Sequence, residues 1–282
     1  ESIMLGKLMA LPKPLPTSSR IEQVVLDSQL LGEARTLQVY LPAEYDKTAN
    51  KRYPVIVLLH GSPGDQNDWI KNADLQSQLD ELINAKIIVP MIVVMPDGNG
   101  PTIIDSEYVD ATKLDQPMES HLTKEIVPFI DAHYLTLADR RFRALGGLSS
   151  GAYGAVNIGL RNLNLFSIMI SHSGYFQNYE WAINELLGKN TNAWHENNPA
   201  DYIDSLNIPP DTSIYLEVAK VDYPSFIKGS QSFASQLAKR HIEHFYTESD
   251  GVHSWSNWRT AIRQSLTYTS SKWLQWGLQT SI

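Results

Sequence analysis

Five residues, Gly147-Leu148-Ser149-Ser150-Gly151, constrain the fold of this chain more than any others. Residues 141–146 before them are typical of a short buried strand, and residues 152–160 after them are small and apolar enough for a helix packed closely on a sheet. A serine between such a strand and helix, with glycines two residues before and after it, is typical of a nucleophile elbow. A side chain at either glycine would collide with the neighbouring strand or helix, so the pattern has a steric reason. A plain Gly/Ser turn is the alternative.

The order of apolar segments predicts the fold class. Two strand-like segments, 21–27 and 35–42, lead the chain, and the second alternates as a half-buried antiparallel pair should. Strands then alternate with helices, which predicts an α/β fold with a mostly parallel central sheet, leading antiparallel strands and helices on both faces. The expected strands are 53–61, 87–95, 141–146, 166–171, 213–218 and 242–247, and the expected helices are 73–85, 119–134, 152–160, 225–240 and one from about 255.

The proline-rich start of the chain predicts an extended arm or linker over residues 1–20. The elbow and the order of strands and helices indicate that residues 21–282 form a single catalytic domain of α/β-hydrolase type. The segments 98–118 and 175–212 are long, and long loops in such folds usually shape the substrate site. Aromatic residues of the second segment suggest a substrate wall or, equally, packing of a cap; these are Tyr175, Tyr179, Trp181 and Trp194.

Composition excludes several classes of site and partner. The net charge is −8 and no Lys/Arg run is present, so nucleic acid is not an expected partner. Without cysteine, the chain has neither disulfides nor a thiol nucleophile. The sequence contains no apolar stretch of about 18 residues or more, so no transmembrane segment is predicted. No cofactor is expected, and no metal either, because His60, Asp65 and Asp68 lack a ligand spacing. Oligomeric state is left open.

The first residue is Glu1 rather than Met, which is typical of a mature or shortened form. A missing leader would make a bacterial extracytoplasmic location the favoured hypothesis. An arbitrary choice of start is the alternative.

A serine nucleophile needs a histidine base, and the base needs a carboxylate to orient it. His253 follows the expected strand 242–247 and therefore lies on a loop at the carboxyl edge of the sheet, where such folds keep their sites. His241 and His244 lie at or within that strand and suit structural roles. We therefore predict that His253 is the base for Ser149.

Asp222 is the predicted acid because it comes just past the expected strand 213–218, at the same edge of the sheet. Glu217, inside that strand, is the second candidate. Asp250 is close to His253 in sequence and more suited to a turn.

An oxyanion hole needs two backbone N–H donors. The N–H of Ser150, directly after the expected nucleophile, is predicted to be one of them. The loop after the first buried parallel strand supplies the other, for which we choose Ser62, since Pro63 has no N–H. His60, at the end of that strand, suits a structural role. Trp69 and Trp255 flank the expected site in sequence and are candidate substrate contacts.

With these residues in place, the chain resembles the esterase D, feruloyl esterase and antigen 85 (mycolyltransferase-like) group of α/β-hydrolases. The matching stretches, in the family's order, are 39–42, 53–61, 138–141, 147–151, 171–174 and 251–255 with Trp258. The resemblance implies Ser149 as nucleophile, Asp222 as acid and His253 as base. Two departures are Ala152, where relatives commonly have glycine, and an acid loop without glycine.

Three functions are compatible with this pattern. The first is a serine carboxylester hydrolase that acts through an acyl-enzyme on a small-molecule, glycan or lipid ester. The second is an acyltransferase that passes the same acyl group to a sugar or lipid hydroxyl. The third is a hydrolase-like domain used only for binding, against which the ordered Ser, Asp and His count.

Overall fold

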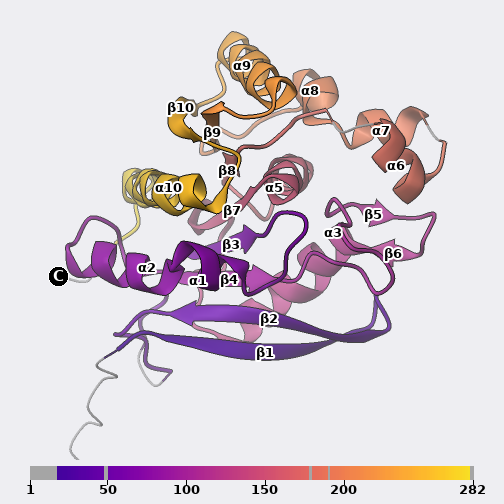
Figure 1. Ribbon diagram of the computed structural model, residues 1–282. Coiled ribbons are helices and arrows are strands. Elements are labelled where there is room, and N and C mark those ends of the chain that lie inside the picture. Colours follow the sequence, from indigo (N-terminus) through magenta and orange to yellow (C-terminus); the bar gives the residue numbers. More distant parts are fainter. Residues whose placement is uncertain (1–17, 48–49, 178–179, 190, 280–282) are drawn as a thin grey trace, which may run out of the picture.

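The structure, a computed structural model, describes residues 18–47, 50–177, 180–189 and 191–279. Eight strands form its main sheet, in the order β1-β2-β4-β3-β7-β8-β9-β10 from the bottom to the top of Figure 1. They are β1 (Arg20–Ser28), β2 (Glu33–Leu41), β3 (Val55–Leu59), β4 (Ile92–Pro96), β7 (Arg143–Leu148), β8 (Ile168–His172), β9 (Ser213–Val221) and β10 (His244–Val252).

The strand directions confirm the predicted sheet. β2 is antiparallel to both of its neighbours, β1 and β4. All other neighbouring strands are parallel. Parallel strands end at one edge of a sheet, so the residues that follow β3, β7, β9 and β10 meet there.

Helices cover both faces of the sheet (Figure 1). One face carries α1 (Asp68–Ala73), α2 (Leu75–Asn84) and α10 (Trp255–Gln275), and the other carries η1 (His121–Ile126), α4 (Val127–His133), α5 (Ser150–Arg161) and α9 (Pro224–Lys239). Along β3, Ile56 and Leu58 pack toward the first group, whereas Val55, Val57 and Leu59 pack toward the second. This two-sided burial is the reason why the central strands are continuous apolar runs.

Two expected elements differ from those observed. The strand expected from residue 87 begins only at Ile92, because α2 ends in a tight turn in which Lys86 has a φ of 56° and Ile87 donates its N–H to Leu82. The helix expected over 119–134 is built of three pieces: α3 (Met118–Ser120), the π-helical η1 and α4.

The two long segments are not plain loops. The first contains the short strands β5 (Asp110–Ala111) and β6 (Gln116–Pro117), and the second contains α6 (Glu180–Leu187), α7 (Thr191–Glu196), α8 (Pro199–Tyr202) and the 3-10 turn η3 (Ile203–Ser205). They touch each other, since Lys113 N–H donates to Leu186 O at 3.0 Å. A further 3-10 turn, η2 (Arg140–Phe142), leads into β7.

Most of the arm expected over residues 1–20 lies outside the described residues, and Arg20 already belongs to β1. Among the described helices, none combines the length and apolar character that crossing a bilayer requires.

Candidate active site

Ser149 occupies the sharp turn between β7 and α5. Its backbone has φ 53° and ψ −120°, a conformation that a residue with a side chain adopts only under strain. A Cβ atom added to Gly147 would lie 2.3 Å from the carbonyl oxygen of Gly151, and one added to Gly151 would lie 2.3 Å from that of His60. Both distances are far below van der Waals contact. The steric reason predicted for the two glycines is therefore confirmed.

The structure brings Ser149, His253 and Asp222 together in one hydrogen-bonded series. His253 Nε2 lies 3.1 Å from Ser149 Oγ, and His253 Nδ1 lies 2.9 Å from Asp222 Oδ1. The pairing of β9 with β10 explains this contact, because Val221 is the register partner of Val252. The next residue on each strand, Asp222 and His253, therefore leaves the sheet at the same place.

The environment of Asp222 favours its charged form. Burial of this fully enclosed side chain raises the pKa of the carboxyl, but His253, the Ser173 hydroxyl and the N–H of Tyr223 outweigh this effect. The pKa of Asp222 is consequently lowered. A charged Asp222 accepts a hydrogen bond from the Nδ1–H of His253. Nε2 then carries no proton and can accept a hydrogen bond from the Ser149 hydroxyl.

Aromatic rings hold the imidazole of His253 in place. The rings of Trp258, Tyr223 and Phe226 have centroids 4.8, 5.1 and 5.5 Å from that of His253. Trp258 is itself fixed, since its Nε1 donates to Ser173 Oγ at 3.2 Å.

The loop after β3 lies against Ser149, as the predicted oxyanion hole requires. A Cβ atom added to Gly61 would be only 3.2 Å from Ser149 Cβ, which places the Gly61 backbone directly beside the serine. Ser62 is the next residue of this exposed loop. Ser150 is the first residue of α5, so its N–H is among those that a helix leaves unpaired at its N-terminus.

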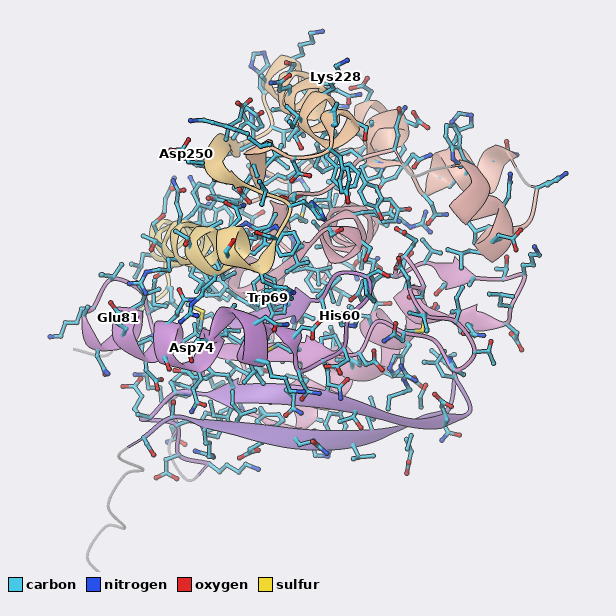
Figure 2. All side chains as sticks on the ribbon, viewed as in Figure 1. His60, Trp69, Asp74, Glu81, Lys228 and Asp250 are labelled. Atoms are coloured by element: carbon cyan, nitrogen blue, oxygen red, sulfur yellow. The ribbon has the colours of Figure 1, made fainter. Side chains whose placement is uncertain are left out.

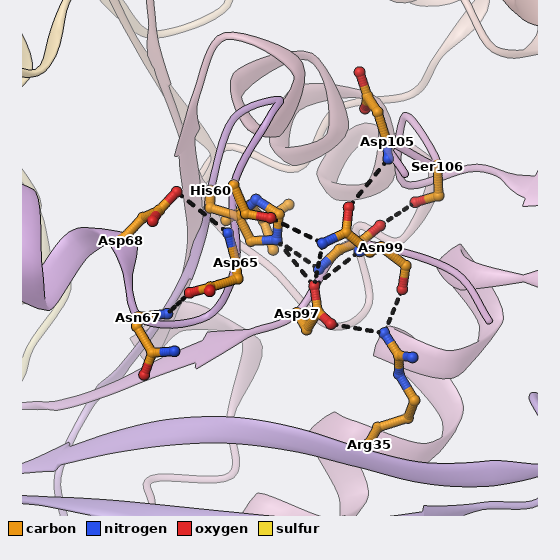
Figure 3. Close-up of polar contacts among 12 residues, drawn as sticks. Arg35, His60, Asp65, Asn67, Asp68, Asp97, Asn99, Asp105 and Ser106 are labelled. Carbon is orange, nitrogen blue, oxygen red and sulfur yellow. Dashed lines mark hydrogen bonds and ion pairs between the residues drawn. The ribbon is translucent and has the colours of Figure 1, made fainter. Parts of the chain in front are cut away.

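A polar network holds this loop from the side of β4 (Figure 3). His60 Nδ1 donates to Gly61 O at 2.8 Å, while its Nε2 accepts the N–H of Gly98 at 2.8 Å. Asn99 Nδ2 donates to Gly64 O at 2.8 Å and to Asp97 Oδ1 at 2.9 Å. His60 thus serves structure, as the sequence predicts.

Asp97 anchors the network in turn. Burial raises the pKa of Asp97, but His60, the Asn99 N–H and the guanidinium of Arg35 outweigh this effect and lower it. Arg35 Nη2 lies 3.0 Å from Asp97 Oδ2 and also donates to the carbonyl of Asn99.

Glu217, the second candidate for the acid, pairs with a different histidine. Its Oε2 lies 3.0 Å from His172 Nδ1, and both side chains are almost completely buried. Its Oε1 accepts from Ser249 Oγ and Asn257 Nδ2. Glu217 therefore ties β8, β9, β10 and α10 together below the site. Asp250 is 91 % exposed and pairs with Lys220, away from His253.

A family model described as "Putative esterase" matches residues 28–269. The chain belongs to this family. The match includes the elbow and both strand ends that carry Asp222 and His253. The expectation of an esterase is confirmed at the level of the family.

Relatives and solved structures agree with this assignment. The endo-1,4-beta-xylanase/feruloyl esterase of Xylanibacter ruminicola is 35% identical over 150 residues, which are 52% of this chain and 20% of that protein. Esterase MT1326 of Mycobacterium tuberculosis is 26% identical over 250 residues, which are 77% of this chain and 52% of that protein. This chain thus spans between a fifth and about half of the length of these two relatives. A solved ferulic acid esterase superposes with a TM-score of 0.81 at 23% identity, covering 91% of this chain and 99% of the other, which shows a common fold.

Of the two tryptophans predicted as substrate contacts, Trp69 is not available for this role. Its side chain is only 1% exposed, lies in the packed interior (Figure 2) and donates its Nε1–H to Leu59 O at 3.0 Å. Trp255 packs edge-on against it, with ring centroids 5.3 Å apart, and stays partly exposed. Proximity in sequence to the site did not reveal that the Trp69 indole fills the core under α1.

The aromatic residues of the 175–212 segment have different positions. Tyr175 is buried, stacks on Tyr153 with ring centroids 5.1 Å apart and donates its hydroxyl to Glu107. These contacts favour the packing role of Tyr175 over a substrate wall. Trp194 is partly buried. Tyr179 and the side chain of Trp181 lie outside the described part of the chain. Over the same described part, no group of three or more His, Asp or Glu side chains is arranged to hold a metal ion.

Proposed function

We propose that this domain hydrolyses carboxylic esters through an acyl-enzyme on Ser149. The observation that carries the proposal is the series Ser149, His253, Asp222, with hydrogen-bonding distances of 3.1 and 2.9 Å at its two steps. A serine hydroxyl is a weak nucleophile near neutral pH unless a base accepts its proton as it attacks. This geometry supplies that base and orients it.

In the proposed reaction, Ser149 Oγ attacks the ester carbonyl carbon while His253 Nε2 takes the hydroxyl proton. The charged Asp222 stabilises the resulting imidazolium. His253 then returns the proton to the alcohol oxygen as the carbon–oxygen bond breaks and the acyl group remains on Ser149. A water molecule attacks the acyl-enzyme with His253 again as base, and this step releases the acid and restores Ser149.

We assign stabilisation of the tetrahedral oxyanion to the backbone N–H groups of Ser62 and Ser150. The support is the position of the Gly61 backbone beside Ser149 and the place of Ser150 at the start of α5. Donors of this kind contribute about 2.7–4 kcal/mol each to transition-state stabilisation.

The substrate we propose is a small ester with an aromatic or short acyl group. Relatives named as feruloyl esterase and ferulic acid esterase support an aromatic acid. Methyl ferulate and short p-nitrophenyl esters are therefore the first substrates to test.

The decisive experiment compares the wild type with Ser149→Ala on p-nitrophenyl acetate and with a fluorophosphonate label. We expect kcat/KM to fall at least about 10³-fold and labelling to disappear in the variant. Ser235→Ala, an exposed serine on α9, is the matched control and should keep both. Equal rates in wild type and Ser149→Ala would refute the assignment of the nucleophile.

Two further results would replace the proposal with one of its alternatives. Turnover that depends on an added sugar or lipid alcohol and exceeds hydrolysis would indicate an acyltransferase. Absence of labelling in the wild type, with no hydrolysis of any ester, would indicate a binding domain.

A further inference from the structure

Three exposed apolar side chains surround the point where the acid and the base leave the sheet. Val221 is 69% exposed, Tyr223 56% and Val252 47%. Among the nine exposed large apolar side chains of the described residues, these three lie together, because Val221 is the register partner of Val252 and Tyr223 follows two residues after Val221. Val221 and Tyr223 flank Asp222, and Val252 precedes His253. Clustered apolar exposure of this kind marks a binding surface more often than single exposed residues do. We call these three residues the apolar rim.

Tyr223 is the member of the apolar rim that contacts the triad. Its ring centroid lies 5.1 Å from that of His253 and 5.2 Å from that of Phe226. Its backbone is held firmly, because its N–H donates to Asp222 Oδ1 at 2.7 Å and the following Pro224 begins α9. The ring thus lies beside the base in a fixed position, with more than half of its surface free.

The chemistry of the proposed reaction says which part of the ester meets this ring. The alcohol oxygen must come within hydrogen-bonding distance of His253 Nε2 to receive its proton. The carbonyl oxygen must instead point to the Gly61 backbone and the start of α5. The alcohol portion of the ester therefore leaves the reacting centre on the side of His253, where the apolar rim lies.

The charge around the apolar rim also restricts its ligand. The nearest charged pair in sequence, Lys220 with Asp250, is joined at 2.6 Å and so presents no net charge. An uncharged, apolar group fits such a surface better than a phosphate or a carboxylate does. A flat ring fits best, because the Tyr223 ring offers a free aromatic surface for stacking.

We propose that Tyr223, with Val221 and Val252, binds the alcohol portion of the ester and selects for alcohols that carry an uncharged ring. The inference rests on the proposed serine mechanism and deepens it. It assigns Tyr223 a role in specificity, through contact with the leaving group rather than with the acyl group.

The test uses two acetate esters that form the same acetyl-enzyme, benzyl acetate and ethyl acetate. In Tyr223→Ala we expect kcat/KM for benzyl acetate to fall about 10-fold further than that for ethyl acetate, since loss of one aromatic contact is worth about one factor of ten. The change with ethyl acetate measures the loss of support for the His253 ring, which both esters share. Tyr223→Phe keeps the ring and should restore the wild-type ratio. Val25→Ala, an exposed apolar residue on β1, is the matched control and should leave the ratio unchanged.

Ethyl phenylacetate, which carries its ring on the acyl side, separates the alternatives. The inference predicts no selective loss with this ester in Tyr223→Ala. A selective loss there would place the ring on the acyl side and overturn the assignment. An equal loss with all three esters would reduce Tyr223 to a support of the triad and would overturn it as well.

Failure of the underlying mechanism gives a different result. A wild type that neither hydrolyses esters nor takes a fluorophosphonate label refutes the proposed function, and the specificity role falls with it. A wild type that is labelled and active, with an unchanged benzyl-to-ethyl ratio in Tyr223→Ala, refutes only the role of Tyr223.

Discussion

Replacement of Asn99 by alanine tests whether the loop beside Ser149 depends on the network drawn in Figure 3. The side chain of Asn99 joins three segments. Its Nδ2 donates to Gly64 O at 2.8 Å and to Asp97 Oδ1 at 2.9 Å, and its Oδ1 accepts the N–H of Asp105 at 3.1 Å. Alanine removes these bonds and leaves the Gly64 carbonyl without this donor. The loop that carries the Ser62 N–H then loses its lateral support.

The expected magnitudes follow from these bonds. Loss of two neutral hydrogen bonds between loops costs about 1–3 kcal/mol of the free energy of unfolding, at about 0.5–1.5 kcal/mol each. Complete loss of one oxyanion donor lowers kcat by about 10²–10³. Asn99 acts on the donor only through the loop, so we expect kcat to fall about 10-fold with a smaller change in KM.

The assay measures kcat and KM on p-nitrophenyl acetate together with the thermal midpoint. Asn162→Ala is the matched control, since Asn162 also bonds through its amide to a backbone carbonyl and a carboxylate, those of Ile158 and Glu119, at the far end of α5. It should lower the midpoint without lowering kcat. If Asn99→Ala behaves like this control, with kcat within about 2-fold of wild type, the reasoning is refuted.

Three other predictions concern stability. Gly151→Ala should destabilise the fold by about 3 kcal/mol or prevent soluble expression, because its Cβ would lie 2.3 Å from His60 O; a wild-type melting temperature would contradict this. Gly229→Ala, in α9, should instead raise stability by about 0.5–1 kcal/mol in urea unfolding, because beyond its chain neighbours and the adjacent helix backbone nothing lies within 4 Å of the added Cβ. Burial raises the pKa of Glu217, but the His172 bond and other partners outweigh it and lower the pKa below 4.5, so its charge stabilises the fold above the unfolded value, and this contribution is lost as pH falls through the native pKa. The stability difference between wild type and Glu217→Gln should therefore shrink from pH 7 to pH 4, and a constant difference would count against it.

Local features of the chain were enough to predict the elbow and the partners of Ser149. The glycines around Ser149 are required by contacts within a few residues or with the adjacent strand, so the motif carries its own steric reason. Asp222 and His253 each follow a strand directly, and parallel strands necessarily end at the same edge of a sheet. Their meeting therefore follows from order along the chain once the sheet is assumed.

The contacts that surround these residues required the tertiary structure. Glu217 and His172 stand 45 residues apart, and only the pairing of β8 with β9 brings them together. The burial of Trp69 depends on how α1 packs against α10 and the sheet, which no periodicity within residues 68–73 reveals.

The sequence by itself thus determined the α/β fold, the elbow and the candidate triad, because strand order and short-range sterics are encoded locally. Only the tertiary structure decided which side chains support the site and which remain open to a substrate. Support for the loop after β3 comes from Asn99, which follows the neighbouring strand β4, and the exposure of Tyr223 depends on what packs around β9 and β10. Burial is a property of the whole packed molecule, and for this reason a linear pattern cannot specify it residue by residue.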